Sequence, residues 1–145
     1  MSNLLITKET ANFLLAMEKY KEQANDVYAP HKGEFISVPL VSADGQERFL
    51  FDYRKGKKST KITYLHRSGA IVKLARVDFG VGHRNPDGTK VGSPHIHLYD
   101  EEHHDKIAYP LPADIFSKLD DPDEVLKEFI AFCNIKDLYF NNNLL

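Results

Sequence analysis

The residues best suited to chemistry in this chain are histidines, and most of them lie close together in the sequence. Seven histidines occur in 145 residues, and five of them fall between His83 and His104. The sharpest pattern is His95-Ile96-His97. Residues two apart in a β-strand point to the same face, so both imidazoles would project together. Such a pair is suited to binding a single transition-metal cation.

The loop that precedes this pair can bring further ligands to it. If residues 70–79 and 95–99 are antiparallel neighbours, the loop between them returns His83 to the vicinity of His95 and places Asp78 across the ladder. Three neutral imidazoles with a carboxylate suit tetrahedral zinc. The sequence therefore predicts a zinc site formed by His83, His95, His97 and Asp78.

A metal at this place is expected to be structural rather than catalytic. The HExxH helical signature is absent, and so is the deaminase pattern of His-x-Glu with Cys-x-x-Cys. A structural ion would fix the long loop of residues 80–94, which is rich in glycine and proline. The alternative that these histidines are ordinary surface or hydrogen-bonding residues stays open.

A metal-free enzyme is the second functional hypothesis. His66-Arg67, His83-Arg84 and the pair at 95 and 97 could supply a base, an acid and a phosphate clamp. Two histidines and a cation can cleave RNA through the 2′-hydroxyl, because imidazole gives and takes protons near pH 7. This alternative is a small histidine-dependent endoribonuclease of the toxin type.

A basic turn is the other candidate binding feature. Lys55, Lys57 and Lys58 lie together, with Arg54 and Lys61 beside them. Such a cluster can hold phosphates or contact a partner, whereas a merely solubilising hairpin tip would have the same composition.

Hydrophobic periodicity predicts the elements that position these residues. Helical spacing after the N-cap residue Thr7 predicts a helix that frays near Asn25–Asp26. From Glu34 to Phe79 the period changes to about two, which predicts strands. The expected strands cover residues 35–40, 49–53, 62–66, 70–79, 95–99 and 107–111. Pro39 cannot donate to a ladder, so the first strand is expected at a sheet edge.

Two short helices are expected to close the chain. One begins near Pro112, and the other has Asp121 as its N-cap and Pro122 at its first position. The predicted fold class is α+β, with an antiparallel five- or six-stranded sheet, an N-terminal helix and C-terminal helices packed on one face. The whole of residues 1–145 is expected to form a single domain.

Composition excludes several classes of protein. Hydrophobic residues make up 42% and charged residues 28%, which is typical of globular domains and excludes disorder or a coiled coil as a whole-chain description. The net charge of −2 gives no strong attraction to nucleic acid, so direct nucleic-acid binding is not expected. Cys133 is the only cysteine, which fits a reducing cytoplasm, and no apolar run is long enough to span a membrane.

A resemblance adds a specific expectation to this interpretation. The residues that carry it run from Asp78-Phe79-Gly80 through His83-Arg84-Asn85-Pro86-Asp87-Gly88 to Pro94-His95-Ile96-His97-Leu98-Tyr99. They resemble a family of small proteins of Gram-positive bacteria and their phages, and within it the chain is similar to zinc-containing type II anti-CRISPR proteins. The resemblance implies a non-enzymatic inhibitor in the host cytoplasm that binds an RNA-guided CRISPR nuclease and blocks loading of target DNA. It implies zinc ligation by residues 83, 95 and 97.

Overall fold

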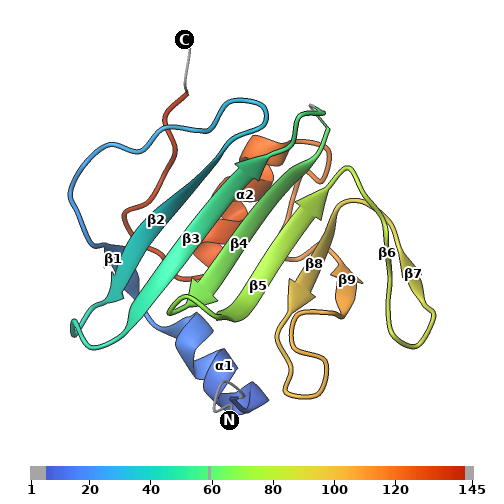
Figure 1. Cartoon of the computed structure of the whole chain (residues 1–145), viewed down its shortest axis with the longest axis horizontal. Helices are drawn as coiled ribbons and strands as arrows, with labels where there is room; N and C mark the ends of the chain where they lie inside the picture. Colours follow the sequence, from blue (N-terminus) through green and yellow to red (C-terminus); the bar gives the residue numbers. More distant parts are fainter. Residues whose placement is uncertain (1–5, 59, 143–145) are drawn as a thin grey trace.

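The fold is a twisted antiparallel sheet with one helix packed across one of its faces (Figure 1). The computed structural model describes residues 6–58 and 60–142. Seven strands form the sheet in the order β1-β2-β3-β4-β5-β8-β9, and β6 and β7 form a separate two-stranded hairpin. The elements are α1 (Lys8–Ala16), β1 (Lys19–Lys21), β2 (Phe35–Ser42), β3 (Arg48–Lys55), β4 (Ile62–Ser68), β5 (Val72–Phe79), β6 (His83–Arg84), β7 (Lys90–Val91), β8 (His95–Leu98), β9 (Ala108–Pro110) and α2 (Pro122–Phe132).

The hydrophobic core lies between the sheet and α2. Alternation along β3 directs Phe49, Phe51 and Tyr53 to this face, and each is no more than 1% exposed. The ring of Phe51 packs 5.9 Å from that of Phe129 on α2. The predicted period of two therefore places the core side of the central strands correctly.

Helix α2 begins as the sequence predicts. The side chain of Asp121 accepts a hydrogen bond from the Glu124 amide, and Pro122 occupies the first turn. Its buried stripe consists of Val125, Leu126, Phe129 and Ile130. These contacts hold α2 on the sheet and leave the opposite sheet face free for polar networks.

The first helix is shorter than predicted. Thr7 caps it as expected, but α1 ends at Ala16 instead of continuing to Asn25–Asp26. The chain then turns into β1, where Tyr20 pairs with Val41 of β2. Sheet pairing outweighs the helical spacing of the apolar residues in this segment.

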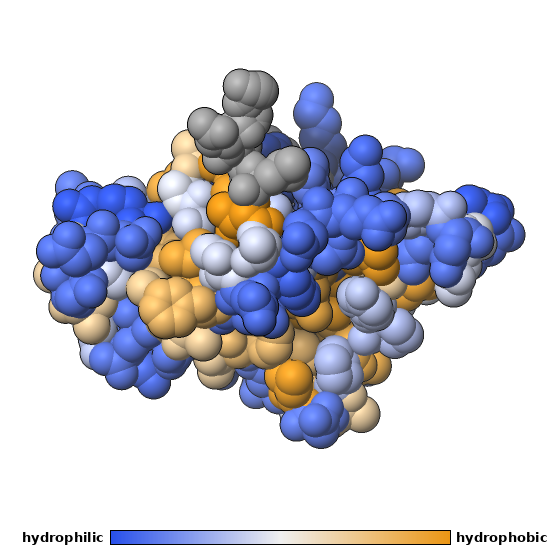
Figure 2. Space-filling model, turned by 90° about the horizontal axis from the view of Figure 1, so that it is seen from below, coloured by the Kyte–Doolittle hydropathy of each residue, from blue (hydrophilic) through white to orange (hydrophobic). Residues whose placement is uncertain are grey.

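Not every apolar side chain of α1 faces the core. Phe13 is 65% exposed, whereas Ala11 is the helix's buried residue. From the end of the molecule where α1 lies, apolar atoms gather at the centre of the surface, and hydrophilic atoms lie on either side of it (Figure 2).

Two other expectations hold only in part. Strand β2 is covered by β1 only along its residues Leu40–Ser42; Pro39 lies just outside this paired stretch, so the half of the strand that precedes it is at an edge, as expected. No α-helix starts near Pro112 within the described residues, because only one turn closes there, with the amides of Ile115 and Phe116 donating to the Pro112 carbonyl.

The structure confirms the predicted fold class, α+β with a mostly β composition. The sheet exceeds the predicted five or six strands because β1 was expected to be helical, and there is one C-terminal helix among the described residues instead of several. None of the helices in the described part of the chain is long and apolar enough to cross a bilayer.

Candidate metal centre

Strands β5 and β8 bring the central residues of the site together. In the antiparallel register, Asp78 lies directly opposite His95, and Arg76 lies opposite His97. Directly opposed residues share a face, so all four side chains lie on the sheet face away from α2. Ile96 points to the other side and is buried in the core. The predicted juxtaposition of the histidine pair with Asp78 is therefore present.

The three predicted ligands are close and almost inaccessible. The Nε2 atoms of His95 and His97 each lie 3.4 Å from Oδ2 of Asp78. One ligand atom from each of these residues lies within 4.8 Å of the others, so the group could hold a metal ion. Both histidines are 1% exposed and Asp78 is 9% exposed. This Asp78–His95–His97 group is called the ligand cluster below.

The backbone orients one imidazole for ligation. Nδ1 of His95 lies 3.0 Å from the carbonyl oxygen of Gly92. If Nδ1 carries the proton and donates it to this carbonyl, the lone pair of Nε2 points toward Asp78. A metal-ligating histidine commonly shows this arrangement, in which the second ring nitrogen donates to a backbone carbonyl. Burial lowers the pKa of His95 and so favours the neutral ring that ligation requires.

The carboxylate of Asp78 is held in its ionised form. Burial alone would raise its pKa, but a hydrogen bond with His97 and the charge of Arg76 outweigh this effect, and the Thr63 hydroxyl donates to Oδ1 over 2.8 Å. The net result is a pKa of about 2. The cluster thus contains a buried anion at neutral pH, which is the charge that a cation site needs.

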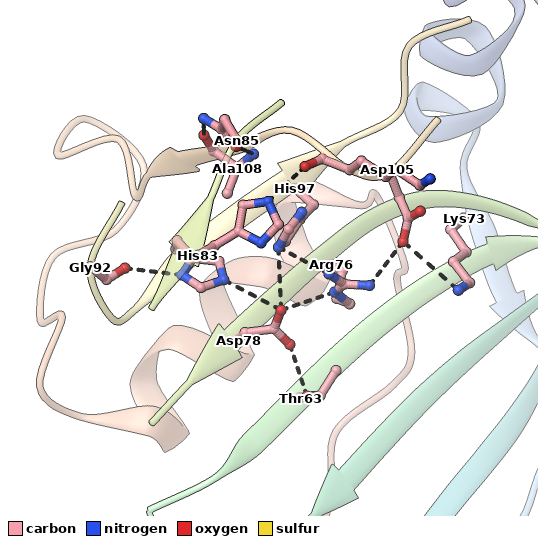
Figure 3. A network of polar contacts seen from close by, with 12 residues as sticks. Thr63, Lys73, Arg76, Asp78, His83, Asn85, Gly92, His97, Asp105 and Ala108 are labelled. Atoms are coloured by element: carbon pink, nitrogen blue, oxygen red, sulfur yellow. Dashed lines mark hydrogen bonds and ion pairs between the residues drawn. The ribbon is translucent and has the colours of Figure 1, made fainter. Parts of the chain in front are cut away.

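The cation that faces the Asp78 carboxylate is Arg76, which was not among the site residues predicted from the sequence. Nε of Arg76 lies 3.0 Å from Asp78 Oδ2, and its Nη2 lies 3.0 Å from His97 Nε2. The same guanidinium donates to Asp105 over 2.8 Å, and Asp105 also lies 3.8 Å from Nζ of Lys73 (Figure 3). The available signal was spacing, because Arg76 precedes Asp78 by two residues on one strand and so shares its face.

The fourth predicted ligand lies beside the ligand cluster but outside it. The ring of His83, on β6, lies 5.8 Å from that of His95 and 4.7 Å from that of His97. Its Nε2, however, lies 2.7 Å from the carbonyl oxygen of Lys106. The loop therefore returns His83 to the vicinity of the pair, as predicted, with one of its nitrogens engaged by the backbone.

One histidine of the ribonuclease hypothesis, His66, lies on the core face of the sheet, opposite the face that holds His95 and His97. His66 is fully buried in the core and stacks on Phe49 with ring centroids 5.5 Å apart. Its neighbour Arg67 pairs with Asp52 at 2.9 Å on the opposite face. The sheet itself thus separates His66 from His95 and His97, so these rings cannot act on one phosphodiester.

The basic turn lies between β3 and β4. Lys57 and Lys58 are exposed there, while Lys55 is half-buried with Nζ 5.7 Å from the centre of the Tyr53 ring. These residues are separate from the ligand cluster and belong to no metal group that the described residues form.

Fold and cluster define a class: an α+β protein with a buried Asp-His-His group that could hold a metal ion. The chain belongs to the family of unknown function DUF6978, whose model matches residues 6–135. That match includes the whole sheet, α2 and the ligand cluster. No curated protein and no solved structure matches the chain.

Proposed function

We propose that this chain is a non-enzymatic binding protein whose fold is stabilised by a zinc ion at Asp78, His95 and His97. One observation carries the proposal: the two histidines are each 1% exposed, so a substrate would have no access to them. A catalytic metal needs an open coordination position, whereas a structural ion is enclosed by protein.

The donor set supports zinc among the common metal ions. Two imidazole nitrogens and one carboxylate oxygen suit zinc, whereas calcium and magnesium prefer oxygen ligands. His83 is the candidate for a fourth ligand, because its ring lies within 6 Å of both others while Nδ1 is not the atom engaged by Lys106. Zinc at the cluster would require Arg76 to leave Asp78 Oδ2 and His97 Nε2, while its contact with Asp105 need not change.

Metal content tests this proposal directly. We expect about one zinc per chain in protein purified without chelator, measured by elemental analysis. His95→Ala should reduce the zinc content severalfold, and the matched control His31→Ala should leave it unchanged, because His31 is exposed and its side chain pairs with Glu34 in its own loop. Equal zinc content in both variants, or none in the wild type, would refute a zinc site at the cluster.

We further propose that the partner is an RNA-guided CRISPR nuclease and that binding prevents loading of target DNA. The support is the resemblance of residues 78–97 to zinc-containing anti-CRISPR proteins. A net charge of −2 is too small for full mimicry of DNA, so occlusion through a protein lobe is the favoured mode. Lys55, Lys57 and Lys58 form the candidate contact surface.

Inhibition of DNA cleavage tests the partner. The chain is added to a type II nuclease with its guide RNA before target DNA, and the cleaved fraction is measured. Inhibition by the wild-type chain would support the partner. The surface would be supported if the double variant Lys57→Glu with Lys58→Glu inhibits less, while the control Lys127→Glu, on the exposed surface of α2, inhibits like the wild type. The absence of both inhibition and co-purification would reject this partner without affecting the zinc measurement.

The ribonuclease alternative has less support. Three of its four candidate rings, those of His66, His95 and His97, are buried, and His66 lies on the opposite sheet face from the other two. Incubation with labelled RNA in the presence of a zinc chelator tests this alternative. Cleavage by the wild type that is lost in His95→Ala would favour the enzyme.

A further inference from the structure

One stretch of the sheet has an unprotected edge, and this stretch is the first half of β2. The β2–β3 register pairs Ile36 with Tyr53 and Val38 with Phe51. The Lys55 amide donates to the Glu34 carbonyl, and the Ser42 amide to the Glu47 carbonyl. Hydrogen-bonded pairs alternate along an antiparallel ladder, so every second residue of β2 directs its backbone groups away from β3.

The outward residues of β2 are therefore Phe35, Ser37, Pro39 and Val41. Val41 pairs with Tyr20 of β1, and the carbonyl of Pro39 accepts from the Glu22 amide. The outward N–H and C=O groups of Phe35 and Ser37 make no hydrogen bond with any of residues 6–58 and 60–142. Four backbone groups in a row are thus available to a further strand.

Both outer edges of the sheet are protected, in contrast. At β1, the Lys19 amide donates to the Asn134 carbonyl, and its carbonyl accepts from the Lys136 amide. At β9, the Asn85 side chain makes both hydrogen bonds of the outward Ala108 backbone, at 2.8 and 3.0 Å. Proteins protect sheet edges in such ways because a free edge pairs with other chains. The unpaired first half of β2 is therefore a place where a strand of another chain could pair.

The free edge is bordered by two adjoining hollows. One, of about 220 Å³, lies between residues 23–28 and residues 36–39; the other, of about 520 Å³, continues past Tyr28 to Phe35. The two aromatic residues are 50% and 54% exposed. In Figure 1 the connection from β1 to β2 runs beside this edge, at the far side of the sheet from β9. Among the described lining residues, Asp26 and Glu34 carry a full charge, while the guanidinium of Arg54 on β3 stacks over the Phe35 ring at 4.5 Å.

From these contacts we infer that the first half of β2 binds an extended peptide segment of a partner as an additional antiparallel or parallel strand, and that the segment carries lysine or arginine. Main-chain hydrogen bonds to Phe35 and Ser37 supply the pairing, and the two acidic side chains select the charge. This inference is independent of the metal site, which lies at β5 and β8.

A pair of substitutions at one position isolates the backbone contribution. Ser37→Pro removes the outward N–H, and Ser37→Ala keeps it, while both remove the Ser37 hydroxyl bond to Asp52. Pro39 already occupies the next outward position of the same strand. The probe is a fluorescein-labelled peptide of alternating valine and threonine with lysine at both ends, and binding is followed by fluorescence anisotropy.

We expect the wild type and Ser37→Ala to bind this probe with similar affinity, and Ser37→Pro to bind at least tenfold more weakly. Asp26→Asn with Glu34→Gln should also weaken binding, and a probe with glutamate ends should bind more weakly still. Amide hydrogen exchange on the wild type gives an answer that does not depend on folding of the variants: the probe should slow exchange at Phe35 and Ser37. Unchanged exchange there, equal affinities of the two Ser37 variants, or equal affinities for both probes would overturn the inference.

Discussion

At the scale of single residues, the ligand cluster could be predicted where it depended on the geometry of one strand pair. A period of two places His95 and His97 on one face, and one antiparallel register brings Asp78 opposite His95, on that same face. The role of Arg76 could not be predicted in this way. Its guanidinium extends past its own position to contact Asp78, His97 and Asp105 together, and such reach depends on side-chain packing.

The position of Arg76 leads to a prediction on metal affinity. Its guanidinium contacts the same Asp78 and His97 atoms that a cation would use. Removing this positive charge should favour metal binding. Arg76→Gln should therefore bind zinc at least about tenfold more tightly than the wild type, which corresponds to about 1.4 kcal/mol of binding free energy. Competition with a chromogenic chelator measures the affinity. Arg84→Gln is the control, since Arg84 is exposed and donates to the Gly88 carbonyl, away from the ligand cluster; weaker binding by Arg76→Gln would contradict the prediction.

The buried ring of His66 should make the free energy of unfolding depend on pH in the acid range. Burial, with a smaller contribution from the positive charge of Lys19, lowers the pKa of His66 from 6.5 to about 3. The unfolded chain therefore takes up a proton at His66 below about pH 6.5, while the folded chain does not. The stabilisation is complete above that pH and is lost as the pH falls toward 3, at about 1.4 kcal/mol per pH unit.

Replacing His66 with phenylalanine should remove this dependence. Between about pH 6.5 and pH 5, we expect the free energy of unfolding to fall by about 2 kcal/mol less in His66→Phe than in the wild type. Urea unfolding at several pH values provides the free energies. His31→Phe at an exposed position is the control, and identical pH slopes for the wild type and His66→Phe would contradict the assignment.

At the scale of elements, prediction succeeded where local chemistry decides and failed where distant pairing decides. Capping residues fixed the starts of α1 and α2 correctly. The end of α1 could not be predicted, because Lys19–Lys21 form a strand only through contact with Leu40–Ser42 and with Asn134. Apolar spacing alone contains no information on such partners.

The end of β5 provides a prediction at this scale. Gly80 follows the strand with φ of +85°, and a Cβ there would lie 2.2 Å from the carbonyl oxygen of Thr60. Gly45 has a similar φ of +77° but has nothing within 4 Å of such a Cβ. Both alanine variants incur the conformational cost of about 1 kcal/mol, and only Gly80→Ala also forces a clash.

We therefore expect Gly80→Ala to lower the free energy of unfolding by about 1–3 kcal/mol more than Gly45→Ala. Parallel urea denaturation of the two variants measures the difference. Equal losses would show that the turn from β3 to β4, which contains Thr60, adjusts freely, and that Gly80 does not fix the start of the loop that leads to His83.

At the scale of the whole molecule, the two faces of the sheet have different roles. The α2 side holds the apolar core, while the other side holds partly buried ion pairs such as Asp52 with Arg67, and Asp78 with Arg76. Networks of this kind define one arrangement of side chains when all members are paired, and they are costly when one is missing. Among the described residues, Nδ1 of His97 is buried without a hydrogen-bond partner, so this network is incompletely paired.

Zinc should therefore stabilise the whole molecule and not only its loop. An ion that binds the folded state alone adds RT ln(1 + [zinc]/Kd), or about 2.7 kcal/mol when free zinc is a hundred times Kd. For a chain of 145 residues this corresponds to a rise in Tm of roughly 5–11 °C, followed by circular dichroism with increasing zinc. His95→Ala should fold with a Tm that does not respond to zinc, whereas His31→Ala should respond like the wild type. A rise in Tm that persists in His95→Ala would mean that zinc stabilises the chain at another site, and a wild type that is indifferent to zinc would leave Arg76 as the permanent cation of the cluster.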